Sequence, residues 1–210
     1  MTDRASPRIS SRKQPRQARS TELVAAVLQA AAQVLADEGI QRFTTARVAE
    51  RAGVSVGSLY QYFPNKASIL FRLQADEWEQ TATMWRRILE DDRKPPLDRL
   101  RALVEAFIRS ECDEAQVRGA LSDAAPLYRD APEALEARRS VDDTMQAFMA
   151  EVLPKATRAT RTLAIELVTS TLGALGEQYS RAPRTPSDIK VYANAVADML
   201  GAYLTLQDRR

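Results

Sequence analysis

The chain has 210 residues, 45% of them hydrophobic, 28% charged and only seven of them glycine, with a net charge of +2; this composition suffices for a buried core and favours long helices. Histidine is absent and Cys112 is the one cysteine, which excludes an internal disulfide, histidine-based zinc sites and histidine-activated nucleophiles. Because the sequence also lacks a phosphate-binding loop, an apolar run of 18 residues and a signal-peptide pattern, we expect an all-α cytoplasmic protein that is not an enzyme, uses no metal or cofactor and contacts no membrane.

The N-terminal part of the chain is basic. Residues 1–66 hold ten Lys and Arg against five Asp and Glu, and six of the ten lie in residues 1–19 among Ser, Pro and Gln. This composition is typical of a flexible arm. The arm is either a solvated tail or a segment that follows DNA phosphates or the minor groove, and the sequence leaves both readings open.

A first helix is predicted from Ser20, where apolar residues begin to recur at spacings of three and four. Gly39 is placed to end it, because glycine is common just past a helix C-terminus. Either Thr44 or Thr45 can cap the next helix by accepting a bond from an unpaired backbone N–H. A short second helix is therefore expected over residues 46–52.

A tight turn follows the second helix. Gly53 is suited to a positive φ, Val54 is an apolar anchor, and Ser55 can cap a third helix that runs through about Tyr62. Two short helices joined by Gly-Val-Ser form a helix-turn-helix.

The segment from Phe43 to Lys66, FTTARVAERAGVSVGSLYQYFPNK, closely resembles the DNA-binding signature of the tetracycline-repressor (TetR) family. The resemblance spans roughly residues 20–70 and combines many fixed spacings. Residues 71–210 resemble the family only in length and helical character. The resemblance implies a DNA-binding regulator in which this helix-turn-helix faces the double helix.

The outer side of the two short helices carries groups suited to DNA. Hydroxyl and ammonium groups can contact phosphates, while Val56 can touch a thymine methyl, Gly57 permits close approach and Gln61 can pair with an adenine edge. Arg47 can reach guanine or phosphate. Phe63 is expected in the core, and Tyr60 and Tyr62 are expected to divide their rings and hydroxyls between packing and phosphate. The predicted DNA-contacting set is Thr45, Arg47, Ser55, Val56, Gly57, Ser58, Tyr60, Gln61, Tyr62 and Lys66.

Further helices fill the rest of the chain. A long fourth helix is expected from Lys66 to Leu89, followed by a loop at 90–96 and helices starting near 97, 117, 132 and 160. Ser187 is expected to cap the last helix. We expect about nine helices and three parts, which are a basic arm at 1–19, a three-helix helix-turn-helix domain at 20–66 and a larger ligand-binding and dimerisation domain at 67–210.

A dimer is expected because a short recognition helix contacts few base pairs, so specificity needs two copies on a two-fold site. Small residues among leucines in the last two helices permit close packing of a four-helix interface. Burial of the same faces within one chain is the alternative, and the TetR resemblance implies the interface. Its predicted residues are Leu167, Thr171, Leu172, Leu175, Val196, Met199, Leu200 and Tyr203.

A small-molecule cavity is expected among the middle helices, where aromatic and polarisable side chains occur. Each of these residues taken alone fits a core position as well as a ligand contact. The predicted ligand-binding residues are Trp78, Trp85, Phe107, Tyr128, Met145, Phe148 and Met149. Cys112, close to them in sequence, fits an inert small hydrophobe and is assigned no role.

The TetR resemblance implies a homodimeric repressor of a palindromic operator. We expect a small-molecule effector to release it by favouring the form of the dimer in which the two recognition helices are wrongly spaced for DNA. Two alternatives stay open. One is a helical module that docks a protein partner, and the other is an activator or architectural DNA-binding protein without a ligand. Strong salt dependence of DNA affinity favours a DNA-binding protein over the docking module, because phosphate neutralisation releases counterions.

Overall fold

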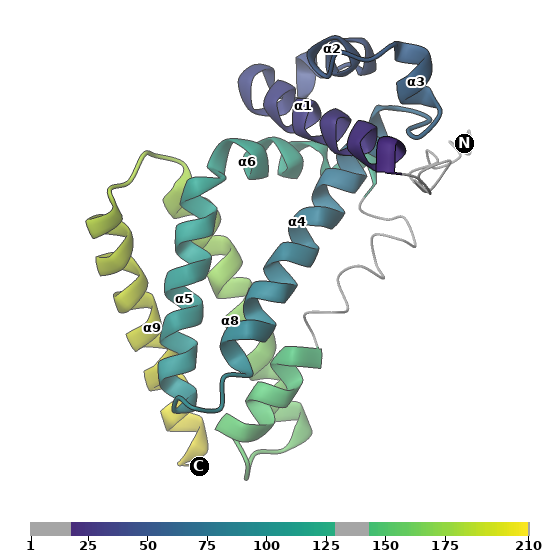
Figure 1. The fold of residues 1–210 in the computed structure, drawn as a ribbon. Helices are drawn as coiled ribbons and strands as arrows, with labels where there is room; N and C mark the ends of the chain where they lie inside the picture. The colour runs from purple at the N-terminus through teal and green to yellow at the C-terminus, as the bar shows by residue number, and fades with distance from the viewer. Residues whose placement is uncertain (1–17, 129–142, 210) are drawn as a thin grey trace, which may run out of the picture. The chain divides into compact units, whose positions relative to one another are not determined.

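The structure, a computed structural model, describes residues 18–128 and 143–209. Every regular element in these two ranges is helical, which confirms the all-α prediction (Figure 1). The helices are α1 (Ala18–Arg42), α2 (Thr45–Arg51), α3 (Val56–Tyr60), α4 (Lys66–Leu89), α5 (Pro96–Asp113), α6 (Ala115–Ala124), the 3₁₀ turn η1 (Ala125–Leu127), a helical run over residues 143–152, α8 (Arg158–Ser180) and α9 (Pro186–Asp208). The predicted basic arm lies outside the described residues as far as residue 17.

Packing divides the chain into two compact units, each with its own hydrophobic core. The N-terminal unit consists of Met1–Glu79 and Gln116–Ala137, and the C-terminal unit consists of Gln80–Ala115 and Arg138–Arg210. The boundary between the units falls inside α4. Helix α6 belongs to the N-terminal unit, although it follows α5 of the C-terminal unit in the sequence. These units are defined by packing alone, so the domain limits at residues 19 and 66 stay predictions.

The N-terminal unit is built around the buried face of α1, where Val27, Ala31 and Leu35 are fully buried. Gly39 has a φ of 71° and bends the helix, which continues to Arg42 beyond the bend. Gly39 therefore lies outside helical geometry and separates the helix before it from a short helical segment that ends at Arg42, which confirms the predicted break at this glycine.

Helix α1 is long and apolar enough to cross a membrane by length and composition alone, with a mean hydropathy of 1.4 over an 18-residue window. Its fully buried side chains, however, lie in the core of the N-terminal unit. Of that window 28% is buried inside the chain, so core packing accounts for part of its apolar character. The expectation that the sequence holds no apolar run of 18 residues is therefore wrong for this helix.

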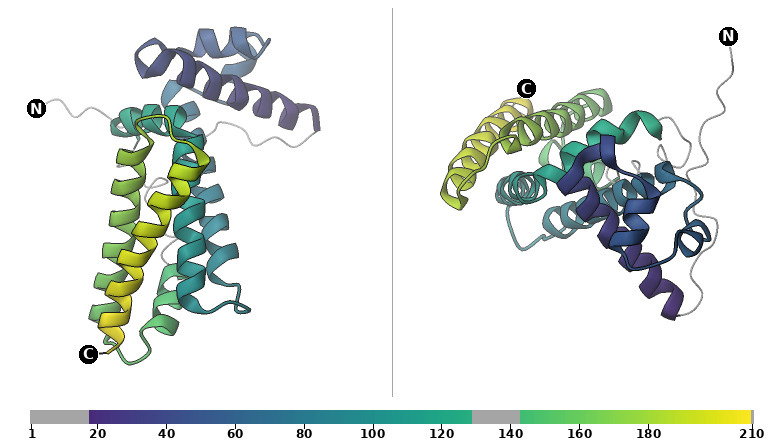
Figure 2. Two further views of the ribbon diagram at one scale, coloured as in Figure 1. Left: turned by 90° about the vertical axis from the view of Figure 1, so that its left-hand side faces the viewer. Right: turned by 90° about the horizontal axis from the view of Figure 1, so that it is seen from above.

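The C-terminal unit is a bundle in which α5 packs against both α8 and α9, and Figure 2 shows α8 and α9 side by side. Its core contains Leu103 of α5, Leu172 of α8 and Leu200 of α9. Helices α5 and α8 approach closely at Gly176, where a Cβ atom would lie 2.8 Å from Glu111 Cγ and 3.0 Å from Phe107 Cε1. Glycine is therefore needed at this crossing.

Helix α9 begins with a capping box. The Thr185 hydroxyl accepts the Asp188 N–H at 3.2 Å, and the Asp188 carboxylate accepts the Thr185 N–H at 3.3 Å. The hydrogen bonds that Thr185 donates hold the pKa of Asp188 below its usual value. The prediction of Ser187 as the N-cap is wrong, because Pro186 suits the first helical position and makes the residue before it the cap.

Candidate functional site

Helix α2 is capped by Thr44, whose hydroxyl accepts the Arg47 N–H at 3.2 Å. This settles which of the two threonines is the cap and leaves the side chain of Thr45 available for another contact. The hydroxyl of Thr45 lies 3.1 Å from the hydroxyl of Tyr60 on α3. One hydrogen bond thus joins the first residue of α2 to the last residue of α3.

The turn between the two short helices is made as predicted. Gly53 has a φ of 67°, and the Val54 N–H donates to the Ala49 carbonyl at 3.0 Å. Ser55 caps α3, accepting the Ser58 N–H at 3.0 Å, and its hydroxyl lies 2.8 Å from that of Ser58. Two of the predicted DNA-contacting hydroxyls are therefore bonded to each other within the cap.

Helix α3 is shorter than predicted and ends at Tyr60 instead of about Tyr62. The N–H groups of Gln61 and Tyr62 donate to carbonyls three residues back, those of Ser58 and Leu59. Such bonds tighten the last turn. Helical geometry therefore stops before Pro64, whose ring disfavours a helical conformation of the residue before it.

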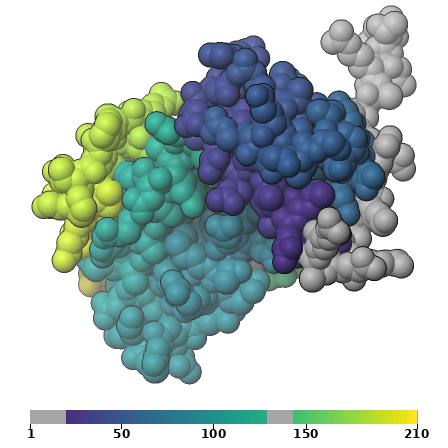
Figure 3. Space-filling view, turned by 45° about the horizontal axis from the view of Figure 1, so that its top comes forward, coloured from purple at the N-terminus to yellow at the C-terminus, as the bar shows by residue number. Residues whose placement is uncertain are grey.

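One face of α3 is left uncovered by the described residues. Val56 is 39% exposed and Tyr60 40% exposed, and Gly57 and Gln61 are exposed beside them. Figure 3 shows the blue surface of this region of the chain. A Cβ atom at Gly57 would meet only the Ser55 hydroxyl, at 3.8 Å, so nothing described within the chain requires glycine there.

Lys66 is exposed at the start of α4. The Asn65 side-chain oxygen accepts the Ser68 N–H at 2.9 Å, and the Ser68 hydroxyl donates to the Asn65 carbonyl at 2.7 Å. These bonds fix the beginning of α4 and hold the Lys66 backbone in place. The ammonium group is thus carried on an ordered helix end.

Two aromatic residues after α3 belong to the core. Phe63 is 1% exposed, which confirms its predicted core position, and Tyr62 is 8% exposed in the same cluster. The ring of Tyr62 is therefore a packing element. Its predicted phosphate contact rests on the hydroxyl group alone.

Arg47 is held by an ion pair that was not predicted from the sequence. Its guanidinium pairs with Glu38 of α1, and Arg51 pairs with Asp37 at 3.0 Å. The signal in the sequence is the acidic pair directly before Gly39, Asp37 and Glu38, which lies close before the two arginines of α2. Arg47 is thus engaged by the protein itself, although its side chain stays 41% exposed.

The structure does not gather the predicted ligand-binding residues into one cluster. Trp78 and Tyr128 belong to the N-terminal unit, where the Tyr128 hydroxyl donates to the Leu121 carbonyl at 3.1 Å. The other five lie buried in the core of the C-terminal unit, and these are Trp85, Phe107, Met145, Phe148 and Met149. Five of the seven thus share the core of one unit, and the site formed by all seven stays a prediction.

The predicted dimer residues divide between surface and core. Met199 is 50% exposed and Leu167 41% exposed, whereas Leu172, Val196 and Leu200 are at most 5% exposed. The buried three cannot form an intermolecular surface, because they fill the core of their own unit. Thr171, Leu175 and Tyr203 are partly exposed.

Cys112 is partly buried, and burial together with the nearby Asp113 raises the pKa of its thiol. A raised pKa lowers the thiolate fraction at neutral pH and with it the reactivity. Among the described residues, no group of three or more Cys, Asp and Glu side chains is arranged to hold a metal ion.

Two family models match the chain. The family described as "Bacterial regulatory proteins, tetR family" matches residues 27–73, and the one described as "Tetracyclin repressor-like, C-terminal domain" matches residues 95–207. The second match alone covers more than half of the chain.

A segment of 83 residues is 41% identical to the nucleoid occlusion factor SlmA of Vibrio campbellii. This match covers 39% of the chain and 42% of the relative, so the chain spans less than half of the length of that protein.

Similar solved structures cover most of the chain. A protein of Mesorhizobium loti classed as a TetR-family transcriptional regulator has a TM-score of 0.70 at 14% identity, over 89% of this chain and 98% of that chain. NalD of Pseudomonas aeruginosa, the secondary repressor of the MexAB-OprM multidrug efflux pump, has a TM-score of 0.63 at 19% identity, over 88% and 96%. At these identities the likeness shows the fold.

Proposed function

The chain belongs to the tetR family of bacterial regulatory proteins, and on that premise we propose that it is a homodimeric transcriptional repressor that binds a palindromic DNA operator and leaves it when a small molecule binds. The uncovered face of α3 carries this proposal. Val56, Gly57 and Gln61 are exposed there while Leu59 anchors the helix in the core. A protein with this role works in the cytoplasm, where the bacterial chromosome lies.

The proposed contacts to phosphate come from groups around that face. The Thr45 and Tyr60 hydroxyls lie together, and Lys66 presents its ammonium group from the start of α4. Hydroxyl and ammonium donors of this kind fix the register of a protein on DNA, while base contacts specify the sequence. We assign Val56, Gly57 and Gln61 to the bases.

Fluorescence anisotropy with a labelled duplex tests DNA binding directly. The logarithm of the affinity should fall linearly with the logarithm of the salt concentration. Lys66→Ala should make that slope shallower by about one, because one phosphate is no longer neutralised by the protein. Lys155→Ala, an exposed lysine of the C-terminal unit, is the matched control and should leave the slope unchanged. A slope near zero would favour the alternative of a protein-docking module.

The proposed dimer surface is an exposed apolar stripe on α8 and α9. Leu163 and Leu167 lie one turn apart on α8, and Val191, Met199 and Leu206 recur at helical spacing on α9. These side chains are between 41% and 69% exposed. Solvent-exposed apolar residues arranged in a continuous stripe are typical of an interface. Two copies of the α8–α9 pair form the four-helix contact in this proposal.

The proposed effector site is the interior of the C-terminal unit around Trp85. This side chain is 4% exposed, and its ring meets that of Phe107 edge to face with centroids 6.0 Å apart. Among the described residues no acceptor lies within hydrogen-bonding distance of Trp85 Nε1. A buried N–H group without a partner favours a ligand that supplies one. We assign to the effector an apolar body and a hydrogen-bond acceptor such as a carbonyl oxygen.

Helix α4 is the proposed link between ligand and DNA. It runs without a break from Lys66 to Leu89, and it carries Trp85 near one end and the phosphate-binding Lys66 at the other. A ligand shifts the equilibrium only by its difference in affinity for the two states. An effector that prefers the conformation with misplaced recognition helices therefore lowers operator affinity.

A screen of neutral aromatic ketones and amides by thermal shift tests this site. A true effector raises the melting temperature and lowers DNA affinity. Trp85→Phe keeps an aromatic ring but removes the N–H donor, so it should weaken ligand binding roughly tenfold or less, the value of one hydrogen bond. Trp78→Phe in the other unit is the control. Ligands that bind without changing DNA affinity would exclude the release mechanism.

A second candidate function is suggested by the relative at 41% identity, which is named for nucleoid occlusion. In that case the protein would act in nucleoid occlusion, and its output would not be transcription. Genome-wide mapping of bound sites separates the two functions. One or a few promoter sites would support the repressor, and many dispersed sites outside promoters would support the second candidate.

A further inference from the structure

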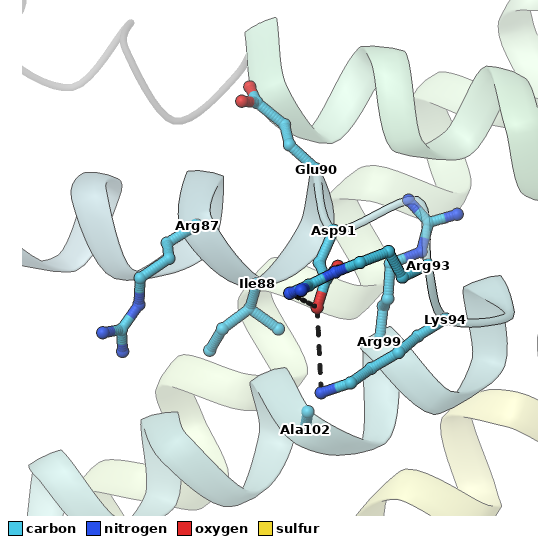
Figure 4. Close-up of a pocket in the computed structure, with 8 residues that line it drawn as sticks. All are labelled: Arg87, Ile88, Glu90, Asp91, Arg93, Lys94, Arg99 and Ala102. Atoms are coloured by element: carbon cyan, nitrogen blue, oxygen red, sulfur yellow. Dashed lines mark hydrogen bonds and ion pairs between the residues drawn. The ribbon is translucent and has the colours of Figure 1, made fainter.

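A pocket of about 550 Å³ lies where the end of α4, the following loop and the start of α5 meet (Figure 4). None of the residues that line it belongs to the effector site proposed above. The apolar part of the wall comes from Ile88 and Ala102. Its volume is in the range of pockets that hold small organic molecules.

The lining of the pocket is rich in positive charge. Four cationic side chains, those of Arg87, Arg93, Lys94 and Arg99, line it together with two carboxylates, those of Glu90 and Asp91. A concave surface with an excess of one charge attracts ligands of the opposite charge. The balance of charge therefore favours an anion over a cation.

The carboxylate of Asp91 is already used by two of these cations. Arg93 Nε donates to it at 2.6 Å and Lys94 Nζ lies 3.8 Å away, and Figure 4 shows Asp91 pointing toward both while Glu90 points away. The hydrogen bond from Arg93 lowers the pKa of Asp91. Asp91 thus stays ionised and holds both cationic side chains at the pocket.

Arg99 is buried in the wall, with 3% of its surface exposed. Its guanidinium donates to the Leu89 carbonyl, pairs with Glu151 and lies 5.6 Å from the ring centroid of Phe148. Its third nitrogen, Nε, carries an N–H with no acceptor among the described residues and almost no accessible surface. A buried donor of a charged group without an acceptor is costly, and a ligand oxygen would satisfy it once a small displacement of the pocket wall uncovers the N–H.

We propose that this pocket binds a small organic anion, whose carboxylate accepts a hydrogen bond from Arg99 Nε and faces the cationic side chains of Arg93 and Lys94. The apolar part of the ligand lies against Ile88 and Ala102. The site is separate from the Trp85 site, since it takes a charged ligand and its lining does not include Trp85.

Benzoate and benzamide form a matched pair of probes, because they share the ring and differ in charge. Binding to the full chain is followed by calorimetry and by the NMR amide signals of Ile88 and Ala102. We expect benzoate to shift these signals and to bind at least about ten times more tightly than benzamide, the value of one charge-assisted hydrogen bond. Equal binding of the two probes, or no benzoate binding at about 50 mM, a concentration far above the 1 mM dissociation constant of a weak ligand, would overturn the proposal.

Variants at exposed positions keep the test independent of folding. Arg93→Gln combined with Lys94→Gln should weaken benzoate binding about tenfold, because neither side chain can then offer a charged donor to the carboxylate. Arg86→Gln, an exposed arginine of α4 that does not line the pocket, is the matched control and should change nothing. If Arg86→Gln weakened benzoate binding equally, the effect would come from the general loss of positive charge, and the proposed site would be overturned.

Inorganic phosphate distinguishes an organic ligand from a simple oxyanion. We expect phosphate to bind more weakly than benzoate, since it gains nothing from Ile88 and Ala102. Phosphate binding as tight as that of benzoate would overturn the assignment to an organic anion. Arg99→Lys keeps the charge and removes the Nε donor, so in a variant whose melting temperature shows it folded, benzoate binding should fall, and unchanged binding would overturn the role of Arg99.

Discussion

The hydroxyl of Tyr60 lies 3.1 Å from the hydroxyl of Thr45, so the exposed end of α3 is tied to the start of α2. Because one of the two hydroxyls donates to the other, one hydroxyl proton of the pair stays free for the proposed phosphate contact. The pair fixes the recognition helix relative to its partner helix in the helix-turn-helix.

Tyr60→Phe tests that pair. Removing one hydrogen bond to phosphate should lower DNA affinity roughly two- to tenfold, the equivalent of about 0.5–1.5 kcal/mol, at every DNA sequence alike. Stability should change little because the hydroxyl is exposed. Anisotropy and thermal melting measure the two effects, and Tyr192→Phe in the C-terminal unit is the control. An unchanged affinity would remove the Tyr60 hydroxyl from the interface.

Gly57→Ala separates folding from DNA contact. Alanine fits within the chain, since its Cβ would meet only the Ser55 hydroxyl at 3.8 Å, and replacing a helical glycine stabilises a protein by roughly 0.5–1 kcal/mol. DNA affinity should nevertheless fall about tenfold, because the methyl group prevents close approach to the bases. Gly119→Ala on α6, where nothing lies within 4 Å, should raise stability and leave DNA affinity unchanged. A gain in affinity for Gly57→Ala would contradict the base-facing position.

Glu38→Gln tests whether the ion pair restrains Arg47. Freeing Arg47 should raise DNA affinity by up to roughly fivefold, since a partly exposed ion pair is worth about 0.2–1 kcal/mol, and Arg47→Gln should cancel the gain. Asp37→Asn removes the same charge beside Arg51 and controls for the general electrostatic effect. If Glu38→Gln and Asp37→Asn raised DNA affinity equally, the gain would come from the lost negative charge alone. Arg47 would then serve only to hold α2 on α1.

Met199→Lys tests the dimer surface. A charge in the exposed stripe of α8 and α9 should give monomers in sedimentation velocity at micromolar concentration. Operator affinity should fall at least roughly 100-fold, because the second half-site no longer adds to binding. Leu97→Lys, at a residue 42% exposed on α5, should remain dimeric. A Met199→Lys protein that stays dimeric would place the interface elsewhere.

Local signals predicted the helix-turn-helix well. Gly53 acts through its own backbone, which adopts a positive φ, and Ser55 acts through its own side chain, which caps α3. Both roles depend on local chemistry, so the sequence predicted them, and both are confirmed. Thr44 and Thr45 are equally good caps in isolation, and only the folded backbone distinguishes them, because Thr44 is extended and accepts the Arg47 N–H. Ser187 and Thr185 are both good caps in isolation, and the start of α9 at Pro186 makes Thr185 the cap.

Longer-range features could not be derived in the same way. Periodicity shows that Leu172 and Leu200 lie on apolar faces, but it does not tell a partner chain from the chain's own core. Tyr128 has an aromatic ring and a hydroxyl, which suit a ligand contact. Its place in the N-terminal core follows from the packing of α6, which the sequence pattern does not show. Arg99 looks like a surface charge on an amphipathic helix, and its burial over Phe148 follows only from the packing around it.

Selection of bound sequences from a random duplex library, with the purified chain and its Gln61→Ala variant, tests the central claim most directly. We predict an enriched two-fold palindrome that becomes degenerate at one position of each half-site in the variant, because the Gln61 amide supplies about 1–3 kcal/mol of discrimination there. No enriched sequence from the folded protein at moderate salt would contradict a sequence-specific regulator.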